Sequence, residues 1–327
     1  MIDVQKNVIL SPYTTFKIGG PAEFFVEVGS GEELVEAIEF ANEKSLDFFI
    51  LGGGSNVLVS DKGFSGLVIK INSKLFVAHD VSIGCGAGWS LAKIVKEAAA
   101  CELSGLEWAI GIPGTVGGAI RGNAGTPGGK ISDSIKTVNY VNTEDLVEEL
   151  GGKKTVKIKT LKKEECEFSY RESIFKQNKN LIILSASFEL RRGNGDKINE
   201  KMKELIRDRV SRQPHGASAG SFFKNPVIEN KKIIDEFESE TGLKVEENKN
   251  LYQDGKIKIP AAWFIDMLGL KGKKMGGAMV SEEHANFIVN TGTATAENVI
   301  MLGSFIKQQV RDQFGVELLE EIQYVGF

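Results

Sequence analysis

The chain has 327 residues, of which 42% are hydrophobic and 26% are charged, and its formal net charge is −4. These values are typical of a globular protein with two or three domains. The negative balance argues against a nucleic-acid-binding surface, and no apolar run is long enough to cross a bilayer. Met1–Leu10 has neither the basic nor the apolar region of a secretory signal, so we expect a cytoplasmic protein.

The cysteines and histidines form no metal-binding pattern. Cys85, Cys101 and Cys166 are widely spaced, without a C-x-x-C pair, which fits a reducing compartment. We expect them to be small buried hydrophobes. The 3 histidines include no H-E-x-x-H. The sequence therefore predicts no protein metal site.

The first quarter of the chain predicts a small β-α-β-β unit. Ser30 and Glu33 form a capping box, and the apolar residues that follow fall on one helical face up to Ala41. Alternating or β-branched residues predict strands at Glu23–Val28, Phe48–Leu51, Val57–Val59 and Leu67–Ile71. The second of these strands runs directly into Gly52–Asn56, and ligands favour the carboxyl ends of strands in α/β folds.

The middle of the chain predicts a second unit dominated by sheet. A strand at Val81–Gly84 precedes a helix over Leu91–Cys101, for which Ser90 is the expected N-cap. A glycine-rich stretch follows the helix. Strand-like segments then occur between Asn, Asp and Gly residues, at Thr137–Val141, Leu146–Glu149, Thr155–Lys159 and Leu181–Leu190.

The last third of the chain is predicted to be α+β. Gly193–Asp196 marks the clearest boundary. Helical periodicity recurs beyond it, at Lys197–Ser211, Lys231–Glu240, Ala261–Leu268 and Glu297–Phe314. Strand patterns occupy Ala285–Val289 and the closing segment Val316–Phe327.

Two glycine-rich stretches predict a ligand site. Gly111–Gly125 reads G-I-P-G-T-V-G-G-A-I-R-G-N-A-G, and Leu51–Asn56 reads L-G-G-G-S-N. So many residues without a Cβ are entropically costly, and a structural turn needs only one or two. The usual reason for so many glycines in one stretch is that they let backbone N–H groups approach a ligand closely, often a phosphate. We therefore expect a large, flat, phosphate-bearing ligand held from two sides.

The common phosphate-binding motifs do not match. No Gly-Lys is followed by Ser or Thr as in Walker A, and the glycines near residue 86 lack Rossmann spacing. For Gly52–Gly54, a plain surface turn is an equally good interpretation. For the second stretch the functional interpretation is better, because Thr115, Arg121 and Asn123 stand between its glycines.

A tyrosine-arginine pair stands in the run E-F-S-Y-R-E-S-I-F-K, residues 167–176. Arg171 is either a structural ion-pair partner of Glu165 or Glu172, or a fixed cation aimed at a developing anion. From spacing alone, the ion pair is the better interpretation.

Two further motifs carry polar groups among apolar residues. The run P-H-G-A-S-A-G-S-F-F-K-N-P at residues 214–226 contains Ser221 but no G-x-S-x-G elbow, so a Ser-His-Asp hydrolase is disfavoured. Glu320 and Glu321 stand on an otherwise apolar C-terminal segment. The simplest interpretation of these carboxylates is a solvated strand edge.

Taken in this order, the motifs resemble those of UDP-N-acetylenolpyruvoylglucosamine reductases, flavin enzymes of bacterial peptidoglycan precursor synthesis. The resemblance covers nearly the whole chain. It rests on T-T-F-K-I-G-G at 14–20, L-G-G-G-S-N-V-L at 51–58, G-I-P-G-T-V-G-G-A at 111–119, S-Y-R-E-S-I-F at 169–175, A-G-S-F-F-K-N-P at 219–226 and E-I-Q-Y-V-G at 321–326. The Y-R-x-S-x-F and G-S-F-F-K-N-P runs are specific to this family.

The resemblance implies an α+β architecture, with a two-subdomain FAD-binding fold of the PCMH type and a C-terminal α/β substrate-binding domain. We expect the subdomains at residues 1–75 and 76–195, the substrate domain at 196–315, and a strand returning to the active site at 316–327. Some members carry an inserted loop with a substrate-contacting tyrosine. Here Phe188–Arg192 leads directly into Gly193–Asp196, so the chain resembles the shorter form.

The resemblance also implies FAD as the cofactor and NADPH as the co-substrate. Neither glycine stretch contains His or Cys, so we expect FAD to bind non-covalently. The residues expected to hold it are Leu51, Gly52, Gly53, Gly54, Ser55 and Asn56 in the first stretch and Gly111, Pro113, Gly114, Thr115, Gly117, Gly118, Ala119, Asn123, Ala124 and Gly125 in the second.

The implied reaction reduces the enolpyruvyl ether of a UDP-sugar. NADPH reduces FAD and leaves, and hydride from the flavin then reaches the terminal vinyl carbon. Arg171 and Glu321 match the family positions that stabilise the enolate, and Ser221 matches the proton donor. Further contacts with the substrate are expected from Tyr170, Arg212, Lys224, Asn225 and His284.

We expect the UDP-sugar to be the only partner, with no nucleic acid and no insertion into a membrane. We expect the protein to be a monomer. One alternative is a FAD-linked oxidase of the same superfamily that acts on a small alcohol or lactone. Another is a non-catalytic nucleotide-binding protein that has kept only the cofactor cradle.

Overall fold

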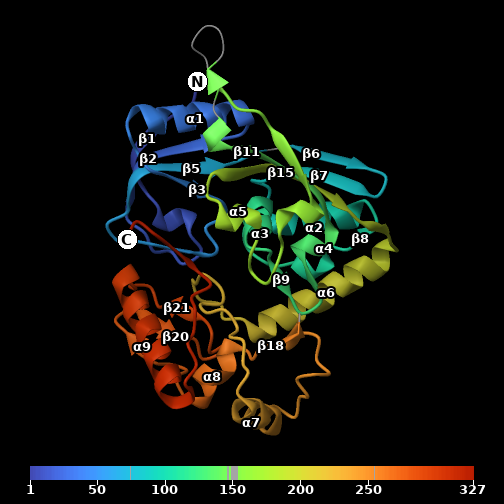
Figure 1. Cartoon of the computed structure of the whole chain (residues 1–327), viewed down its shortest axis with the longest axis vertical. Coiled ribbons are helices and arrows are strands. Elements are labelled where there is room, and N and C mark those ends of the chain that lie inside the picture. Colours follow the sequence, from blue (N-terminus) through green and yellow to red (C-terminus); the bar gives the residue numbers. More distant parts are fainter. Residues whose placement is uncertain (74, 146, 149–153, 254) are drawn as a thin grey trace.

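The computed structural model describes residues 1–73, 75–145, 147–148, 154–253 and 255–327. In the view of Figure 1, two β-sheets occupy the upper half, with α1 above the first and the short helices α2 to α5 below the strands of the second. Helices α7, α8 and α9 occupy the lower half, and α6 lies between the two.

The first sheet has the strand order β1-β2-β5-β3. Its strands are β1 (Gln5–Ile9), β2 (Pro21–Val28), β5 (Phe64–Ile71) and β3 (Phe48–Leu51). β1 pairs with β2 antiparallel, whereas β5 pairs with β2 and β3 in parallel. Helix α1 (Gly31–Glu43) begins after Ser30, whose hydroxyl accepts a hydrogen bond from the Glu33 N–H, as predicted. The Glu33 carboxylate returns to the Gly29 N–H instead of that of Ser30.

The second sheet is antiparallel and has the strand order β14-β11-β15-β7-β6. Its strands are β6 (Phe76–His79), β7 (Ser82–Gly86), β11 (Ile135–Asn142), β14 (Lys159–Lys162) and β15 (Leu181–Glu189). The helices associated with it are α2 (Leu91–Ala100), α3 (Val116–Arg121), α4 (Ile131–Ser134) and α5 (Ile174–Gln177).

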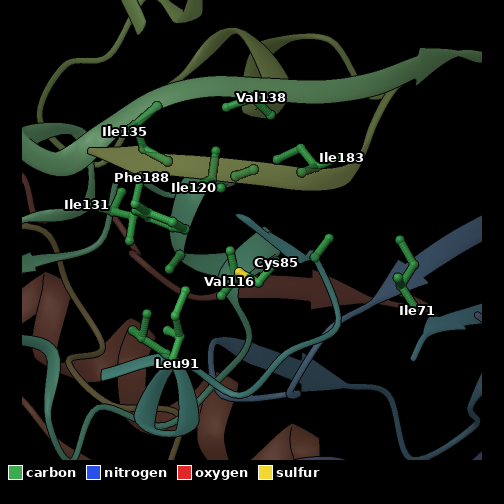
Figure 2. Close-up of a cluster of buried hydrophobic side chains, with 14 of the residues drawn as sticks. Ile71, Cys85, Leu91, Val116, Ile120, Ile131, Ile135, Val138, Ile183 and Phe188 are labelled. Carbon is green, nitrogen blue, oxygen red and sulfur yellow. The ribbon is translucent and has the colours of Figure 1, made fainter. Parts of the chain in front are cut away.

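One hydrophobic core joins both sheets. It extends from Val26 and Val28 of β2, through α1, to Phe188 of β15 and Ile198 of α6 (Gly195–Arg212). Figure 2 shows the part around α3, where buried residues of α2, α3, α4, β7, β11 and β15 gather. The second glycine-rich stretch is thus not a loop throughout, because its second half is a helix with a buried apolar side, and this was not predicted.

A second core lies in the C-terminal part. It involves α7 (Lys231–Thr241), α8 (Ala261–Met267), α9 (Ala296–Phe314) and the sheet of β19 (Lys274–Met275), β20 (Ala278–Val280) and β21 (Ile288–Asn290). The Asp61 carboxylate, between β4 (Val57–Val59) and β5, accepts hydrogen bonds from the N–H groups of Ala296 and Glu297 at the start of α9.

The C-terminus returns to the first glycine stretch. β22 (Gln323–Val325) pairs in parallel with β4 (Val57–Val59), which follows that stretch directly. The remaining strands form short pairs, β8 (Leu103–Ser104) with β16 (Arg191–Arg192), β9 (Gly125–Thr126) with β10 (Gly129–Lys130), β12 (Val147–Glu148) with β13 (Lys154–Thr155), and β17 (Tyr252–Gln253) with β18 (Lys256–Ile257). Turns of 3-10 helix occur at Ser11–Tyr13, Glu107–Ala109, Thr143–Asp145 and Lys163–Cys166.

Several local predictions were wrong in detail. Helix α2 begins as expected, but the Ser90 side chain makes no capping hydrogen bond, and Ser90 forms a β-bridge with Thr115. The strand predicted at Thr155–Lys159 is split between β13 and β14, and Leu146 and Glu149 lie outside the described residues. The predicted strands Ala285–Val289 and Val316–Phe327 are reduced to β21 and β22.

Candidate active site

A cavity of about 900 Å³ lies against both glycine stretches. Its wall includes Phe49 of β3, Ile183 of β15, and Arg171, Ser221 and Glu321. These residues come from both sheets, from the serine motif and from the C-terminal segment. The cavity therefore joins the two halves of the molecule.

The two glycine stretches touch each other. A Cβ on Gly53 would lie 2.6 Å from the Cα of Gly114, and a Cβ on Gly114 would lie 2.7 Å from the Ser55 hydroxyl. That hydroxyl donates to the carbonyl of Pro113 at 3.2 Å. The predicted arrangement of two opposed stretches is therefore present. Part of the glycine content serves this mutual contact rather than contact with a ligand.

The chemistry of the stretches fits a diphosphate. The backbone N–H groups of Gly53, Gly54 and Ser55 in one stretch, and of Gly114 and Thr115 in the other, donate to no acceptor among the described residues. Converging free N–H groups form the type of concave site that binds phosphate oxygens. The cavity volume lies near the upper end of the roughly 300–1,000 Å³ range of small-molecule sites. The residues present thus fit FAD.

Every residue predicted to bind FAD lines this cavity except Asn123. Asn123 is 3% exposed, has a φ of +40°, and donates from Nδ2 to the Ser169 carbonyl at 2.8 Å. Its Oδ1 accepts from the Ser132 N–H. The amide therefore ties the end of α3 to the segment before the tyrosine-arginine pair.

Arg171 is held on three sides. Its Nε donates to Oε1 of Glu321 at 2.6 Å, and its Nη2 donates to the Gly125 carbonyl at 3.0 Å. Its backbone has a φ of +58°, in the left-handed region that few residues other than glycine occupy, and Lys176 Nζ donates to its carbonyl at 2.8 Å. The predicted ion pair exists, but its predicted partners, Glu165 and Glu172, were wrong.

Glu321 is positioned by both halves of the protein. Its N–H donates to the Phe222 carbonyl at 2.8 Å, and its own carbonyl accepts from Asn56 Nδ2 at 3.0 Å. Its neighbour Glu320 is paired with Lys307 at 3.0 Å. The interpretation of these carboxylates as a solvated strand edge is therefore wrong.

Ser221 lies on the cavity wall beside a rigid anchor. Phe222 and Phe223, both 1% exposed, pack edge to face in the second core. The buried side chain of Asn286 hydrogen-bonds both the N–H and the carbonyl of Phe223, at 3.0 and 2.9 Å. Within the described part of the chain, the Ser221 hydroxyl makes no hydrogen bond, so it is available to a ligand.

The residues on either side of Arg171 also contact the C-terminal half. The Tyr170 hydroxyl accepts from the Asn225 N–H at 3.3 Å, and burial raises the pKa of Tyr170. The Glu172 carboxylate accepts from Lys224 at 2.8 Å and from Lys176 at 3.1 Å. Burial alone would raise the pKa of Glu172, but these two hydrogen bonds lower it below the ordinary value.

None of the five predicted substrate contacts lines this cavity. Tyr170, Lys224 and Asn225 lie beside it, with the polar partners described above and with Asn225 Oδ1 accepting from the Ala261 N–H. Arg212 is exposed and pairs with Asp208 on its own helix at 2.8 Å. His284 accepts from the Asn286 N–H through Nδ1, and burial lowers its pKa. Their roles in substrate binding stay predictions.

Sequence reasoning assigned no site role to several cations near the cavity. Arg121, Lys176, Lys179 and Arg209 line it, and Lys258, 6% exposed, lies 4.1 Å from the centre of the Tyr170 ring. Arg209 donates from Nη2 to the Trp108 carbonyl at 3.3 Å, and its buried Nε has no hydrogen-bond partner among the described residues. Arg121 was noticed only as a residue between glycines. Lys176 was noticed only as the last residue of the run at 167–176.

The described residues contain no cluster of three or more His, Cys, Asp or Glu side chains that could hold a metal ion. Among the described helices, none has the length and apolar character required to span a membrane.

Comparisons with known proteins agree with this geometry. Residues 22–151 match the FAD binding domain family, and residues 212–325 match the C-terminal domain family of UDP-N-acetylenolpyruvoylglucosamine reductase. The chain is 39% identical over 322 residues to the UDP-N-acetylenolpyruvoylglucosamine reductase of Caldanaerobacter subterraneus, covering 98% of this chain and 93% of that protein. It is 39% identical over 326 residues to that of Carboxydothermus hydrogenoformans, covering 99% and 94%. The crystal structure of the Thermus caldophilus reductase has a TM-score of 0.73 and 32% identity, covering 99% of this chain and all of that one.

Proposed function

The chain belongs to the UDP-N-acetylenolpyruvoylglucosamine reductase family, and from this premise we propose how its residues carry out the family's reaction. The reaction is the NADPH-dependent reduction, through FAD, of the enolpyruvyl group of UDP-N-acetylglucosamine enolpyruvate to UDP-N-acetylmuramate in peptidoglycan synthesis. The family assignment leaves the small-alcohol oxidase without support.

We propose that the two glycine stretches hold FAD non-covalently. The free N–H groups of Gly53, Gly54, Ser55, Gly114 and Thr115 are available for its diphosphate. When bound there and reduced by NADPH, FAD would supply the hydride for the terminal vinyl carbon of the substrate. Cys85 stands two residues before Ala87, which lines the cavity. Its side chain is fully buried in the first core, which fits non-covalent binding of FAD (Figure 2).

Three side chains on the cavity wall are proposed to complete the reduction. Arg171 is the fixed cation that stabilises the negative charge developing toward the substrate carboxylate, and Glu321, joined to it at 2.6 Å, contributes as a protonated or hydrogen-bonded group. Ser221, whose hydroxyl is free of hydrogen bonds to the described residues, gives a proton to the adjacent carbon. A serine is a weak acid, so this transfer is reasonable only because an enolate carbon is a strong base.

The observation that carries this proposal is the convergence of distant segments on one cavity. Both glycine stretches, Arg171, Ser221 and Glu321 line the same space although they span residues 51–321. A nucleotide-binding protein without catalysis has no need to bring an arginine, a hydroxyl and a carboxylate to one end of its site.

The test separates the two half-reactions by stopped-flow absorbance under anaerobic conditions. In Ser221→Ala, NADPH should bleach the bound flavin at the wild-type rate, while reoxidation by the enolpyruvyl UDP-sugar should slow by about 100-fold or more. Ser218→Ala is the matched control, since Ser218 lines the same cavity three residues earlier. It should leave both steps near wild type. Equal losses in both steps of Ser221→Ala would contradict the role of the serine, and a wild-type protein that takes up no flavin would overturn the whole proposal.

We also propose the division into residues 1–75, 76–195, 196–315 and 316–327, and a monomer that acts in the bacterial cytoplasm. The second core, formed mostly by residues 219–322, supports a separate C-terminal unit, and the first core joins both sheets and extends into α6 at Ile198 and Met202. Limited proteolysis and light scattering test these limits and the oligomeric state.

A further inference from the structure

Arg121 is a half-buried cation at the reacting end of the cavity. It ends α3, lines the cavity, and donates from Nη1 to Oε1 of Gln323 at 3.2 Å. Gln323 is two residues from Glu321, and its N–H donates to the Asn56 carbonyl at 2.9 Å. Arg121 and Arg171 therefore approach the Glu321 segment from two different elements.

The two arginines differ in their partners. Arg171 is bound to Glu321, whereas no carboxylate forms an ion pair with Arg121 in the part of the chain that the structure describes. Burial lowers the pKa of Arg121, and only the more distant charge of Glu172 opposes this effect. Holding a partly desolvated guanidinium without an anion is unfavourable, and such groups concentrate at functional sites.

The charged side chains around Arg121 also include more cations than anions. Arg121, Arg171, Lys176 and Lys224 face two carboxylates, Glu172 and Glu321. Glu172 is shared by both lysines, and Glu321 is engaged by Arg171. The reacting end therefore lacks a negative group, and a bound anion would supply it.

We propose that Arg121 binds the carboxylate of the enolpyruvyl group, an inference that rests on the proposed function. The substrate has two kinds of anion, its diphosphate and this carboxylate. The carboxylate is bonded to the carbon that receives the proton, so it must lie near Ser221 and Glu321, at the end of the cavity where Arg121 is fixed by Gln323. A guanidinium suits this group, because it offers paired N–H donors to a planar carboxylate.

The test compares two ligands that differ only in this carboxylate-bearing group. Dissociation constants of UDP-N-acetylglucosamine enolpyruvate and of UDP-N-acetylglucosamine are measured by flavin absorbance titration of the oxidised, FAD-loaded protein. Arg121→Met should weaken the first ligand at least ten-fold and the second less than two-fold. Arg121→Lys, which keeps the charge, should recover part of the loss. Arg209→Met is the matched control, because Arg209 is another partly buried arginine on the cavity wall, and it should not distinguish the two ligands.

Other outcomes of these titrations would contradict either this proposal or the proposed function. Equal weakening of both ligands in Arg121→Met, or no weakening of either, would overturn the proposal. A shift in the flavin reduction potential without a change in ligand preference would also overturn it, because Arg121 would then act on the cofactor. If the wild-type protein binds flavin but neither ligand, the proposed function itself fails, and this is visible before any variant is made.

Discussion

Replacing Gly53 by alanine would place a methyl carbon 2.6 Å from the Cα of Gly114 and 3.1 Å from its carbonyl carbon. Both neighbours are backbone atoms, so no side chain can rotate away and the two glycine stretches must separate. Overpacking of this kind costs about 1–3 kcal/mol of folding free energy. Separation would also withdraw N–H groups from one side of the cofactor diphosphate. Loss of one charged hydrogen bond, about 1.5–3 kcal/mol, corresponds to roughly a 10- to 100-fold weaker affinity for FAD.

The assay is fluorescence titration of the apoprotein with FAD, together with its urea denaturation. The matched control is Gly122→Ala in the same stretch. A Cβ there would meet only the Gly118 carbonyl at 3.6 Å, and the φ of −92° suits alanine. We expect the control to change apoprotein stability by less than about 0.5 kcal/mol. If Gly53→Ala binds FAD as tightly as the wild type and is as stable, the contact between the stretches is not what positions them.

Four further predictions follow from other contacts. Glu172→Gln and Lys224→Met should show a coupling free energy of about 0.5–3 kcal/mol in a double-mutant cycle of urea denaturation, because their ion pair joins the two halves of the molecule. Since hydrogen bonds lower the pKa of Glu172 in the folded protein, its contribution is present above the pKa of an unfolded glutamate and is lost as the pH falls through the folded value. The acid side of the stability profile should therefore be flatter in Glu172→Gln, and an unchanged profile would contradict this. Asp61→Ala should cost about 0.5–2 kcal/mol by removing the acceptor at the start of α9, measured against the exposed control Glu297→Ala. Burial raises the pKa of Cys85 and of Cys166 to about 12, so neither thiol should react with iodoacetamide near neutral pH, as read by mass spectrometry, until urea unfolds the chain.

Local periodicity predicted the longer helices well. The expected helix at Lys231–Glu240 differs from α7 by a single residue, and the start of α8 at Ala261 was predicted correctly. An amphipathic helix of this length can be predicted locally, because its apolar periodicity lies within the segment itself. The helix α3 was missed because its glycines argue against a helix, and only its packing reveals why they are there. A Cβ on Gly117 would lie 2.8 Å from that of Ala87, so the helix rests directly on the segment after β7.

The candidate site was predicted from motifs rather than from contacts. Spacing suggested an ion pair for Arg171 with a neighbour in sequence, but its partner is 150 residues away. No local pattern contains that information, because the pair depends on the C-terminal segment returning along β4. Asn123 was predicted to bind the cofactor because it stands between glycines. The structure gives its amide two backbone partners instead, which a single sequence does not reveal.

The C-terminal segment explains why the reacting groups depend on both cores. Glu321 is joined through its N–H to Phe222, the residue after Ser221, and through its carbonyl to Asn56 in the first glycine stretch. The segment of the proposed proton donor and the proposed cofactor loop therefore both bind the backbone of Glu321, one through its N–H and the other through its carbonyl. Movement of the C-terminal half relative to the first core would separate Glu321 from Asn56 or from Phe222. The arrangement of Ser221, Arg171 and Glu321 seen here accordingly requires the two halves to be closed on each other, which is also the condition that excludes water from a reduction of this kind.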